Sequence, residues 1–130
     1  IVLLECTSPI KSVEEIDQAI MILKDGMADS VATFKQTATS PNRLWKIENE
    51  LVKPFIDGAK PFLPRQMQPV GYELSGQIYA LTTSVLNLNP GSISILLGKI
   101  HPIITKTEVI DIDNEIDLLI AEKIFEYNKI

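Results

Sequence analysis

The apolar and polar positions of the first 26 residues predict a strand followed by a helix. Ile1 to Leu4 form a continuous apolar run, typical of a fully buried strand. Ser12 followed three residues later by Glu15 is a capping-box signature for a helix from about Ser12 to Asp25, which Gly26 would terminate. The expected buried stripe of this helix consists of Val13, Ile16, Ile20, Leu23 and Met27.

A second strand is predicted from Asp29 to Phe34, where β-branched and apolar residues predominate. A strand, a capped helix and another strand in about 35 residues form a βαβ unit. Such a unit favours a parallel sheet with helices packed on its faces. The expected fold class is therefore α/β, in one domain or part of one.

The middle of the chain predicts a small hairpin followed by a long loop. Trp45–Ile47 and Leu51–Lys53 flank the turn sequence Glu48-Asn49-Glu50. Prolines then interrupt any regular strand or helix. These prolines are Pro54, Pro61, Pro64 and Pro69.

The last third alternates short apolar runs with turn residues. Strands are predicted at Gly76–Leu81, 93–97 and 100–104, with a short helix at Thr83–Leu88 and a turn at 89–91. A last short strand is expected to end at Asp111-Ile112-Asp113, and Asn114 would cap a terminal helix. The apolar face of that helix is expected to consist of Ile116, Leu119, Ile120, Ile124 and Tyr127.

Composition narrows the class of protein. The 130 residues carry a net charge of -5, which argues against a nucleic-acid partner. No apolar run approaches the roughly 18 residues that a membrane span needs, so no membrane association is expected. Cys6 is the only cysteine, which fits a reducing, cytoplasmic location.

Asp111 and Asp113 are candidate metal ligands. In an extended strand, residues two apart share a face, so both carboxylates would point to one side. Such a pair attracts a cation, and Mg²⁺ is suited to one or two carboxylates completed by waters and substrate phosphates. In the alternative interpretation, Asp113 or Asn114 merely caps the last helix and Asp111 is a solvated residue at a strand end.

Basic residues in the predicted loops are candidate anion ligands. Lys11, Arg43 and Arg65 could converge on a phosphate or carboxylate, for which the arginine fork is suited. Each of them taken singly also fits ordinary surface charge.

Four segments in order resemble the acylneuraminate cytidylyltransferase family. They are Leu3-Leu4-Glu5-Cys6-Thr7-Ser8-Pro9-Ile10-Lys11, Pro64-Arg65-Gln66, Tyr72-Glu73-Leu74-Ser75-Gly76-Gln77-Ile78-Tyr79 and Ile110-Asp111-Ile112-Asp113-Asn114-Glu115-Ile116-Asp117. The resemblance implies a Rossmann-like nucleotidyltransferase sheet with flanking helices. It implies transfer of CMP from CTP to a 2-keto sugar acid, with release of pyrophosphate.

The resemblance also implies roles for particular residues. Asp111 and Asp113 would be catalytic and would hold Mg²⁺. Substrate-binding roles would fall on Thr7, Ser8, Arg43, Arg65, Ser75 and Tyr79. Residues 1–130 would form the carboxy-terminal part of a single cytidylyltransferase domain. The nucleotide-binding loop at the amino-terminal end of that domain would lie before Ile1. A dimerisation excursion would fall at about 87–107, in a homodimer.

Four positions depart from the family pattern. Glu5, Lys11, Glu73 and Ser75 stand where the family usually has Gln, Arg, Arg and Asn. Two alternatives therefore stay open: a substrate other than N-acetylneuraminate, and a non-catalytic nucleotide-sugar-binding or assembly module of the same fold.

Overall fold

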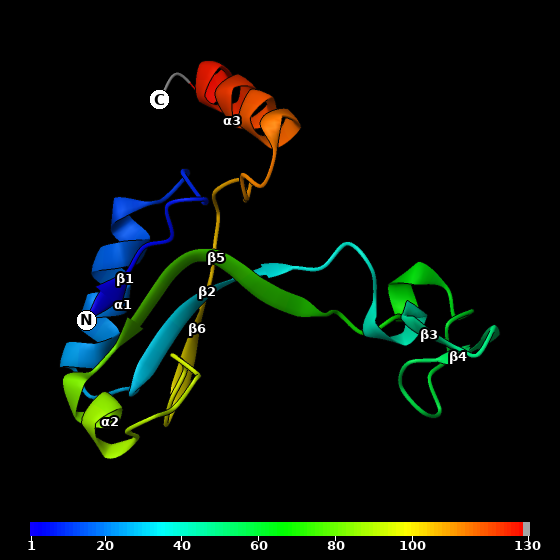
Figure 1. The fold of residues 1–130 in the computed structure, drawn as a ribbon, viewed down its shortest axis with the longest axis horizontal. Helices are drawn as coiled ribbons and strands as arrows, with labels where there is room; N and C mark the ends of the chain where they lie inside the picture. Colours follow the sequence, from blue (N-terminus) through cyan, green and yellow to red (C-terminus); the bar gives the residue numbers. More distant parts are fainter. Residues whose placement is uncertain (129–130) are drawn as a thin grey trace. The chain divides into compact units, whose positions relative to one another are not determined.

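Four strands form one sheet in the computed structural model, which describes residues 1–128 (Figure 1). Their order is β1-β5-β2-β6, comprising Val2–Leu3, Tyr72–Leu81, Ser30–Gln36 and Ile100–Ile104. β2 and β6 are parallel, with Ser30 opposite Ile100. β1 and β5 are antiparallel, with Val2 opposite Ala80. The protein is a mixed α/β structure with a mixed sheet, so the expectation of a parallel sheet holds for β2 and β6 but not for β1 and β5.

The direction of β5 follows from how the chain returns to the sheet. The Thr37 N–H donates to the Gly71 carbonyl at 2.9 Å, which holds the exit from β2 beside the approach to β5. At the other end of the strand, the Thr82 N–H donates to the Asp29 carbonyl at 3.0 Å. The end of β5 therefore lies at the start of β2, and the two strands run in opposite directions, as in a long hairpin.

Helix α1, Val13–Lys24, begins and ends where the sequence predicts. The Ser12 hydroxyl caps it by accepting from the Glu15 N–H at 3.2 Å. At its end the Met27 N–H donates to the Ile22 carbonyl and the Gly26 N–H to the Leu23 carbonyl, the bond pair of a Schellman motif. Gly26 has φ +67°, which favours glycine.

The buried face of α1 is displaced from the predicted stripe. Val13 and Met27 are 66% and 49% exposed, so placing them in the core was wrong. Ala19 and Ile22 are buried instead, with Ile16 and Leu23 packed partly against them. A stripe defined only by apolar residues overlooks alanine, whose small side chain lets a helix approach a sheet closely. The core cluster consists of Ala19, Ile22, Ala28, Val31, Ile78, Ala80 and Ile103.

The opening strand is an edge strand rather than a fully buried one. β1 has two residues and pairs with β5 on one side. Ile1, Leu3 and Leu4 are all exposed, which corrects the prediction. An apolar run shows that a segment favours burial but not how many neighbouring strands cover it.

Residues 36–73 form a separate compact unit. The predicted hairpin is confirmed as β3, Trp45–Glu48, and β4, Leu51–Pro54, with Ile47 opposite Val52. Two short 3₁₀ helices, η1 Pro41–Arg43 and η2 Arg65–Met67, lie in the loops. The Trp45 and Phe62 rings are 6.4 Å apart between centroids. No residue of 36–73 is buried within the structure.

The last third departs from prediction at two strands. Helix α2, Thr83–Leu88, and strand β6 are confirmed. The expected strand at 93–97 is absent, because Ser92 and Ser94 hydroxyls hydrogen-bond to nearby backbone groups and hold the segment in turns. No strand ends at Asp113 either, since residues 105–112 adopt irregular structure.

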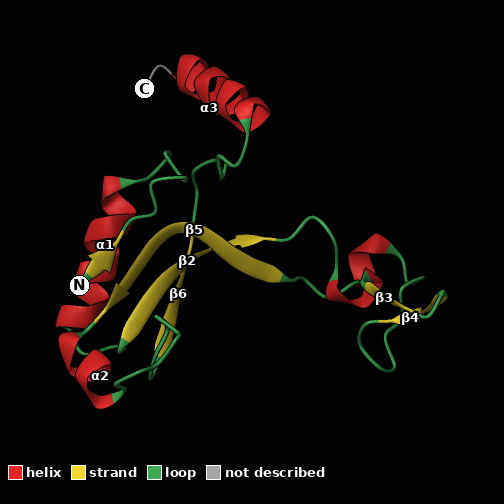
Figure 2. Cartoon of the chain, in the orientation of Figure 1, coloured by secondary structure: helices red, strands yellow, loops and turns green. Residues whose placement is uncertain are grey.

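Helix α3 spans Glu115–Asn128 (Figure 2), and side chains cap its amino-terminal end. The Asn114 side-chain oxygen accepts from the Ile116 and Asp117 N–H groups at 2.9 and 3.2 Å, as predicted. In return, the Asp117 carboxylate accepts from the Asp113 and Asn114 N–H groups at 3.0 and 3.1 Å. This reciprocal arrangement is a capping box. None of the helices within residues 1–128 has the length and hydrophobicity needed to cross a bilayer.

Candidate functional site

The loop that follows β1 is folded around the side chain of Lys11. Its ammonium donates to the Glu5 carbonyl at 2.6 Å and also to the Ser8 carbonyl. Burial lowers the pKa of Lys11, while charges at Cys6 and Glu5 act in the opposite direction. Lys11 therefore closes the loop over residues 5–11, and its donors are directed to backbone oxygens.

Gln77 of β5 fastens this loop to the segment that precedes α3. Its buried side-chain amide donates to the Ile10 carbonyl at 2.7 Å, to the Thr107 hydroxyl at 2.8 Å and to the Glu108 carbonyl at 3.2 Å. Three acceptors from two distant segments thus meet at one nitrogen. Gln77 was not among the predicted site residues, although a glutamine next to the apolar run 78–81 is a signal of buried hydrogen bonding.

A backbone hydrogen bond joins the two segments a second time. The Ile112 N–H donates to the Thr7 carbonyl at 2.8 Å. Burial raises the pKa of Tyr79, and the nearby charges of Glu5 and Asp111 raise it further. The segments of Thr7 and Asp111 are therefore joined, and the charges of Glu5 and Asp111 both act on Tyr79.

Gly76 creates a small cradle in β5 beside this group. It has φ +75°, and a Cβ placed on it would lie 3.3 Å from the Ser8 hydroxyl oxygen and 3.5 Å from a Glu5 carboxylate oxygen. Ser8 is 1% exposed, and its hydroxyl has no hydrogen-bond partner within the described residues. Buried hydroxyls are normally paired, so this one is an open hydrogen-bonding position.

Asp111 and Asp113 are exposed and lie in irregular structure rather than in a strand. The alternation of side chains in a strand therefore does not place Asp111 and Asp113 on one face. Asp113 also takes part, through its N–H, in the cap of α3. Across residues 1–128 no group of three or more His, Cys, Asp or Glu residues could hold a metal ion. Two carboxylates fit Mg²⁺ whose remaining ligands are waters and phosphates.

Ser75 lies in the core. Its hydroxyl donates to the Thr33 hydroxyl at 2.7 Å, and Thr33 in turn accepts from the Ile78 N–H at 3.1 Å. Ser75 is 4% exposed. These contacts tie β5 to β2 and direct the Ser75 hydroxyl into the protein.

The two arginines predicted to bind substrate belong to the unit formed by residues 36–73. Arg43 is exposed and donates to the Pro61 and Leu63 carbonyls, both at 3.2 Å, so it braces the proline-rich loop. Arg65 starts η2 and lines a cleft of about 120 Å³ with Gln68 and Gly71. Arg65 thus lies at a concave surface within its own unit.

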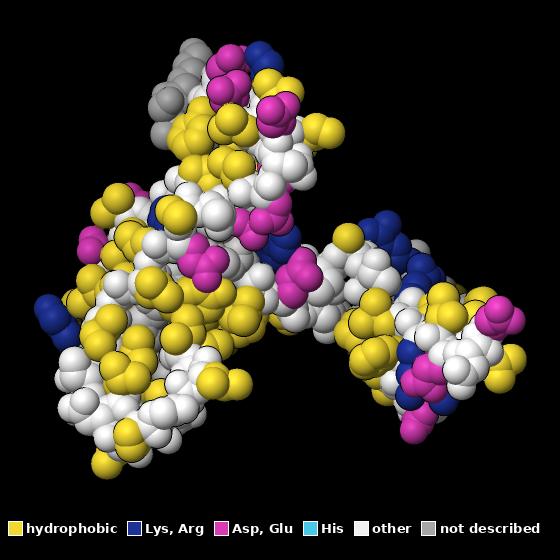
Figure 3. Space-filling model, viewed as in Figure 1, with side chains coloured by type: hydrophobic (Ala, Val, Ile, Leu, Met, Phe, Trp, Pro, Cys, Tyr) yellow, Lys and Arg dark blue, Asp and Glu magenta, His cyan; other side chains and the backbone are white. Residues whose placement is uncertain are grey.

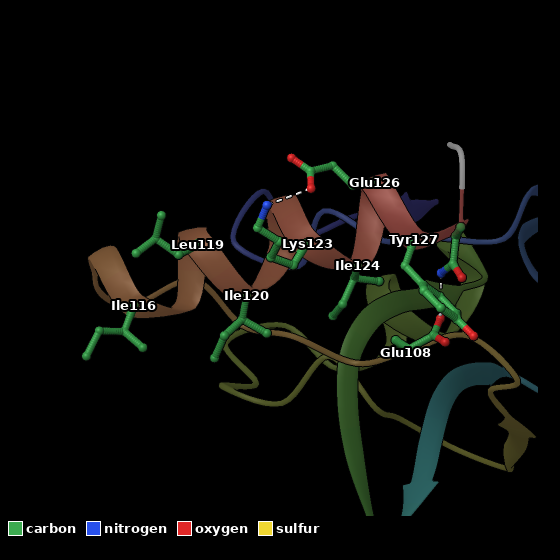
Figure 4. Close-up of a pocket in the computed structure, with 9 residues that line it drawn as sticks. Glu108, Ile116, Leu119, Ile120, Lys123, Ile124, Glu126 and Tyr127 are labelled. Carbon is green, nitrogen blue, oxygen red and sulfur yellow. Dashed lines mark hydrogen bonds and ion pairs between the residues drawn. The ribbon is translucent and has the colours of Figure 1, made fainter.

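A larger groove of about 770 Å³ runs along α3 (Figure 4). None of the predicted catalytic or substrate-binding residues lines it. The predicted apolar face of the helix lines it, yet Ile116, Leu119 and Tyr127 are 68%, 59% and 87% exposed. Lys123 pairs with Glu126 at 2.7 Å on the helix, and Glu108 accepts from Asn128 at 3.2 Å. This surface is an open helix face without convergent catalytic groups.

Comparison with known proteins adds no family assignment. No protein-family model matches the chain, and no curated protein does so.

Proposed function

We propose that this protein is a cytidylyltransferase of the acylneuraminate type, which transfers CMP from CTP to a 2-keto sugar acid in the cytoplasm. The observation that carries the proposal is the 2.8 Å bond between the Ile112 N–H and the Thr7 carbonyl. It joins the first and last of the four segments on which the resemblance rests. This contact between segments far apart in sequence supports the proposal.

Different residues of the chain would bind the substrate and hold the loop in position at this site. The loop over residues 5–11, closed by Lys11, would present its backbone groups and the half-buried Thr7 to a sugar. Tyr79, whose raised pKa keeps its phenol protonated, can donate a hydrogen bond. Gln77 holds the loop in place through its bonds to Ile10 and Thr107. The Rossmann-like identity of the sheet belongs to the same proposal.

Asp111 and Asp113 would hold Mg²⁺ together with substrate phosphates. The bound ion would neutralise phosphate charge during displacement of pyrophosphate. Both carboxylates are exposed, which leaves them accessible to a cation.

The alternative is a non-catalytic module that binds a nucleotide sugar. The capping box of α3 favours it, because Asp113, Asn114 and Asp117 have a structural role without any metal. In that case the acidic segment is retained for the helix and not for turnover.

The homodimer remains a proposal, and the surface of residues 36–73 suits it. This unit has no buried residue, and several large apolar side chains on it are exposed, as Figure 3 shows for one face. They include Ile47, Leu51, Phe55, Phe62 and Met67. A partner would supply the burial that the unit lacks. Part of the interval 87–107, where the excursion was expected, belongs to the sheet as β6.

The test is pyrophosphate release by the protein expressed from its complete gene. Each nucleoside triphosphate is offered with a panel of 2-keto sugar acids and Mg²⁺. We expect release with CTP and a sugar acid, and a loss of about 100-fold or more in Asp111→Ala, as for removal of a charge-stabilising group. Glu122→Ala, an exposed acidic change on α3, is the matched control.

Two results would contradict the proposal. The first is the absence of turnover with every pair of substrates. The second is an Asp111→Ala variant as active as the control. Binding of a CMP-sugar without turnover, equal in both proteins, would favour the non-catalytic module.

A further inference from the structure

The small sheet within residues 36–73 is incomplete. Its two strands, β3 and β4, pair only with each other within residues 1–128. A sheet of two strands is at best marginally stable in water, and none of the residues 36–73 is buried. The hairpin therefore lacks both the further strands and the apolar cover that stabilise a sheet.

One face of this hairpin is wholly apolar. Directly opposite residues in an antiparallel pair share a face. The apolar face consists of two such pairs, Trp45 with Pro54 and Ile47 with Val52. Ile47 and Val52 are 73% and 60% exposed, so most of this face is uncovered.

The other face carries a lysine without a counter-charge. Lys46 lies opposite Lys53, and like charges in directly opposite positions destabilise a sheet. The Glu48 carboxylate pairs with Lys53 at 2.8 Å. Lys46 has no ion pair with another residue of the described part of the chain. A carboxylate on the free side of Lys46 would therefore stabilise the hairpin.

The hydrogen-bond alternation shows which edge can accept another strand. The Phe55 N–H donates to the Leu44 carbonyl at 2.8 Å, so these opposite residues form a hydrogen-bonded pair. Such pairs alternate along an antiparallel ladder, so Trp45 and Ile47 direct their N–H and carbonyl groups outward. On the outer edge of β4, Pro54 has no N–H to donate. The outer edge of β3 is therefore the better template for a further strand.

The charges on β3 are complementary to those of a second copy of the same strand. A two-fold axis brings β3 against itself in the antiparallel direction. With the axis at Ile47, Lys46 lies opposite Glu48 of the partner subunit, and this ion pair forms twice. Moving the axis by one residue would instead place Lys46 opposite Lys46 of the partner subunit. Charge therefore selects the register centred on Ile47.

We infer that β3 pairs with β3 of a second copy of this chain, antiparallel and centred on Ile47, to form a four-stranded sheet. In this register the two Ile47 residues exchange backbone hydrogen bonds, and the two apolar faces become continuous. The inference rests on the homodimer that is part of the proposed function. It adds the strand that makes the contact, its register and the ion pair between Lys46 and Glu48.

The first experiment measures proximity by disulfide formation. Cys6→Ser removes the single cysteine, and one new cysteine is then introduced at a time. Opposite residues of a hydrogen-bonded pair have Cα atoms about 5.5 Å apart, a separation that a disulfide spans. In a glutathione redox buffer, Ile47→Cys should give about tenfold more covalent dimer than Val52→Cys, because β3 separates Val52 from the two-fold axis.

Two results of this experiment would overturn the inference. The first is as much covalent dimer from Val52→Cys as from Ile47→Cys, which would indicate random collision. The second is more covalent dimer from Lys46→Cys than from Ile47→Cys, which would indicate the register that places the two lysines together.

The second experiment measures the dissociation constant of the dimer by sedimentation equilibrium. Ile47→Pro removes the outward N–H and should weaken the dimer about tenfold or more, whereas Ile47→Val keeps it and should change the constant little. Slow hydrogen exchange of the Phe55 N–H checks that each variant keeps the hairpin. Equal dissociation constants for Ile47→Pro and Ile47→Val would refute pairing through β3.

A charge exchange tests the ion pair. Lys46→Glu places two carboxylates opposite each other across the axis and should weaken the dimer. Adding Glu48→Lys to this variant restores opposite charges and should recover the dimer. A double variant as weak as Lys46→Glu alone would refute the pairing of Lys46 with Glu48.

These outcomes are separable from the proposed function. A dimer that persists in Ile47→Pro leaves the homodimer in place and refutes β3 as its contact. A protein that stays monomeric at every concentration refutes both. If the dimer depends on β3 but no pyrophosphate is released with any pair of substrates, the pairing stands and the transferase proposal fails.

Discussion

The carboxylate of Glu15 accepts hydrogen bonds from the Thr105 hydroxyl at 3.2 and 3.0 Å. It also accepts from the Lys106 N–H at 2.9 Å. Glu15 is 7% exposed, so α1 directs a buried carboxylate to the end of β6. A capping-box glutamate usually reaches back to the N–H of the capping residue, whereas this one joins two elements of the fold.

Replacing Glu15 should destabilise the protein. Glu15→Ala leaves the Thr105 hydroxyl and the Lys106 N–H without their acceptor, and we expect a loss of about 3 kcal/mol in the free energy of unfolding. Glu15→Gln keeps an acceptor and should lose less. Urea denaturation followed by circular dichroism measures both. Glu14→Ala, at a fully exposed neighbour, is the control, and equal midpoints for Glu14→Ala and Glu15→Ala would contradict this role.

The cap of α3 gives a prediction that separates structure from catalysis. Asn114→Ala removes the acceptor for the Ile116 and Asp117 N–H groups and should cost about 1 kcal/mol, seen as faster hydrogen exchange in the first turn of α3. Asp113→Ala keeps the cap, since Asp113 contributes its backbone N–H.

Asp113→Ala and Asn114→Ala should have opposite effects on pyrophosphate release and on hydrogen exchange in α3. If Asp113 binds Mg²⁺, Asp113→Ala loses pyrophosphate release while hydrogen exchange in α3 stays normal. Loss of activity in Asn114→Ala with retention in Asp113→Ala would indicate that the segment acts through the helix alone.

The hairpin turn between β3 and β4 holds two residues in the left-handed region. Asn49 and Glu50 have φ of 51° and 63°, as in a type I′ turn. Glutamate is strained there and glycine is not, so Glu50→Gly should stabilise the hairpin by about 1 kcal/mol. Slower hydrogen exchange at Ile47 and Val52 would show it. Glu48→Gly, outside the turn, is the comparison and should have the opposite effect.

Tyr79 should ionise only at a pH above the ordinary tyrosine value of 10.0, because burial and the charges of Glu5 and Asp111 disfavour the phenolate. The unfolded chain releases this proton first as pH rises. The stabilisation from Tyr79 is therefore complete below about pH 10, the usual pKa of tyrosine, and is lost as pH rises through the folded pKa.

Ultraviolet titration of the wild type minus Tyr79→Phe isolates this ionisation. Glu5→Gln removes one of the negative charges and should lower the pKa of Tyr79 toward its ordinary value. A Tyr79 pKa equal in both backgrounds would show that Glu5 does not act on the phenol.

Local features were predicted well because neighbouring residues determine them. Helix ends lie where they were expected, because hydrogen bonds within a few residues set them. The residues at these ends are Ser12, Gly26 and Asn114. The hairpin of β3 and β4 follows from its short turn. The strand expected at 93–97 failed because hydroxyl groups of Ser92 and Ser94 compete for backbone groups, an effect that apolar spacing does not record.

Short motifs named the candidate site residues but did not give their geometry. Thr7 and Asp111 were named from short motifs, and a backbone bond to Ile112 does join their segments. Ser75 was named from the same kind of motif, yet its hydroxyl pairs with Thr33 in the core. Motif spacing does not reveal which face of a strand each residue occupies when Gly76, with φ +75°, interrupts the regular alternation.

The sequence by itself determined the helix ends, the hairpin, the mixed α/β composition and the acidic charge, since these depend on contacts between near neighbours. The tertiary structure alone decided that β1 is an edge strand, that β5 runs against β2, and that Gln77 and Glu15 fasten distant segments. It also set the unpaired Ser8 hydroxyl beside Glu5. The bonds of Gln77 and Glu15 join residues dozens of positions apart, and the energies of all these contacts depend on burial, which exists only once the chain has folded.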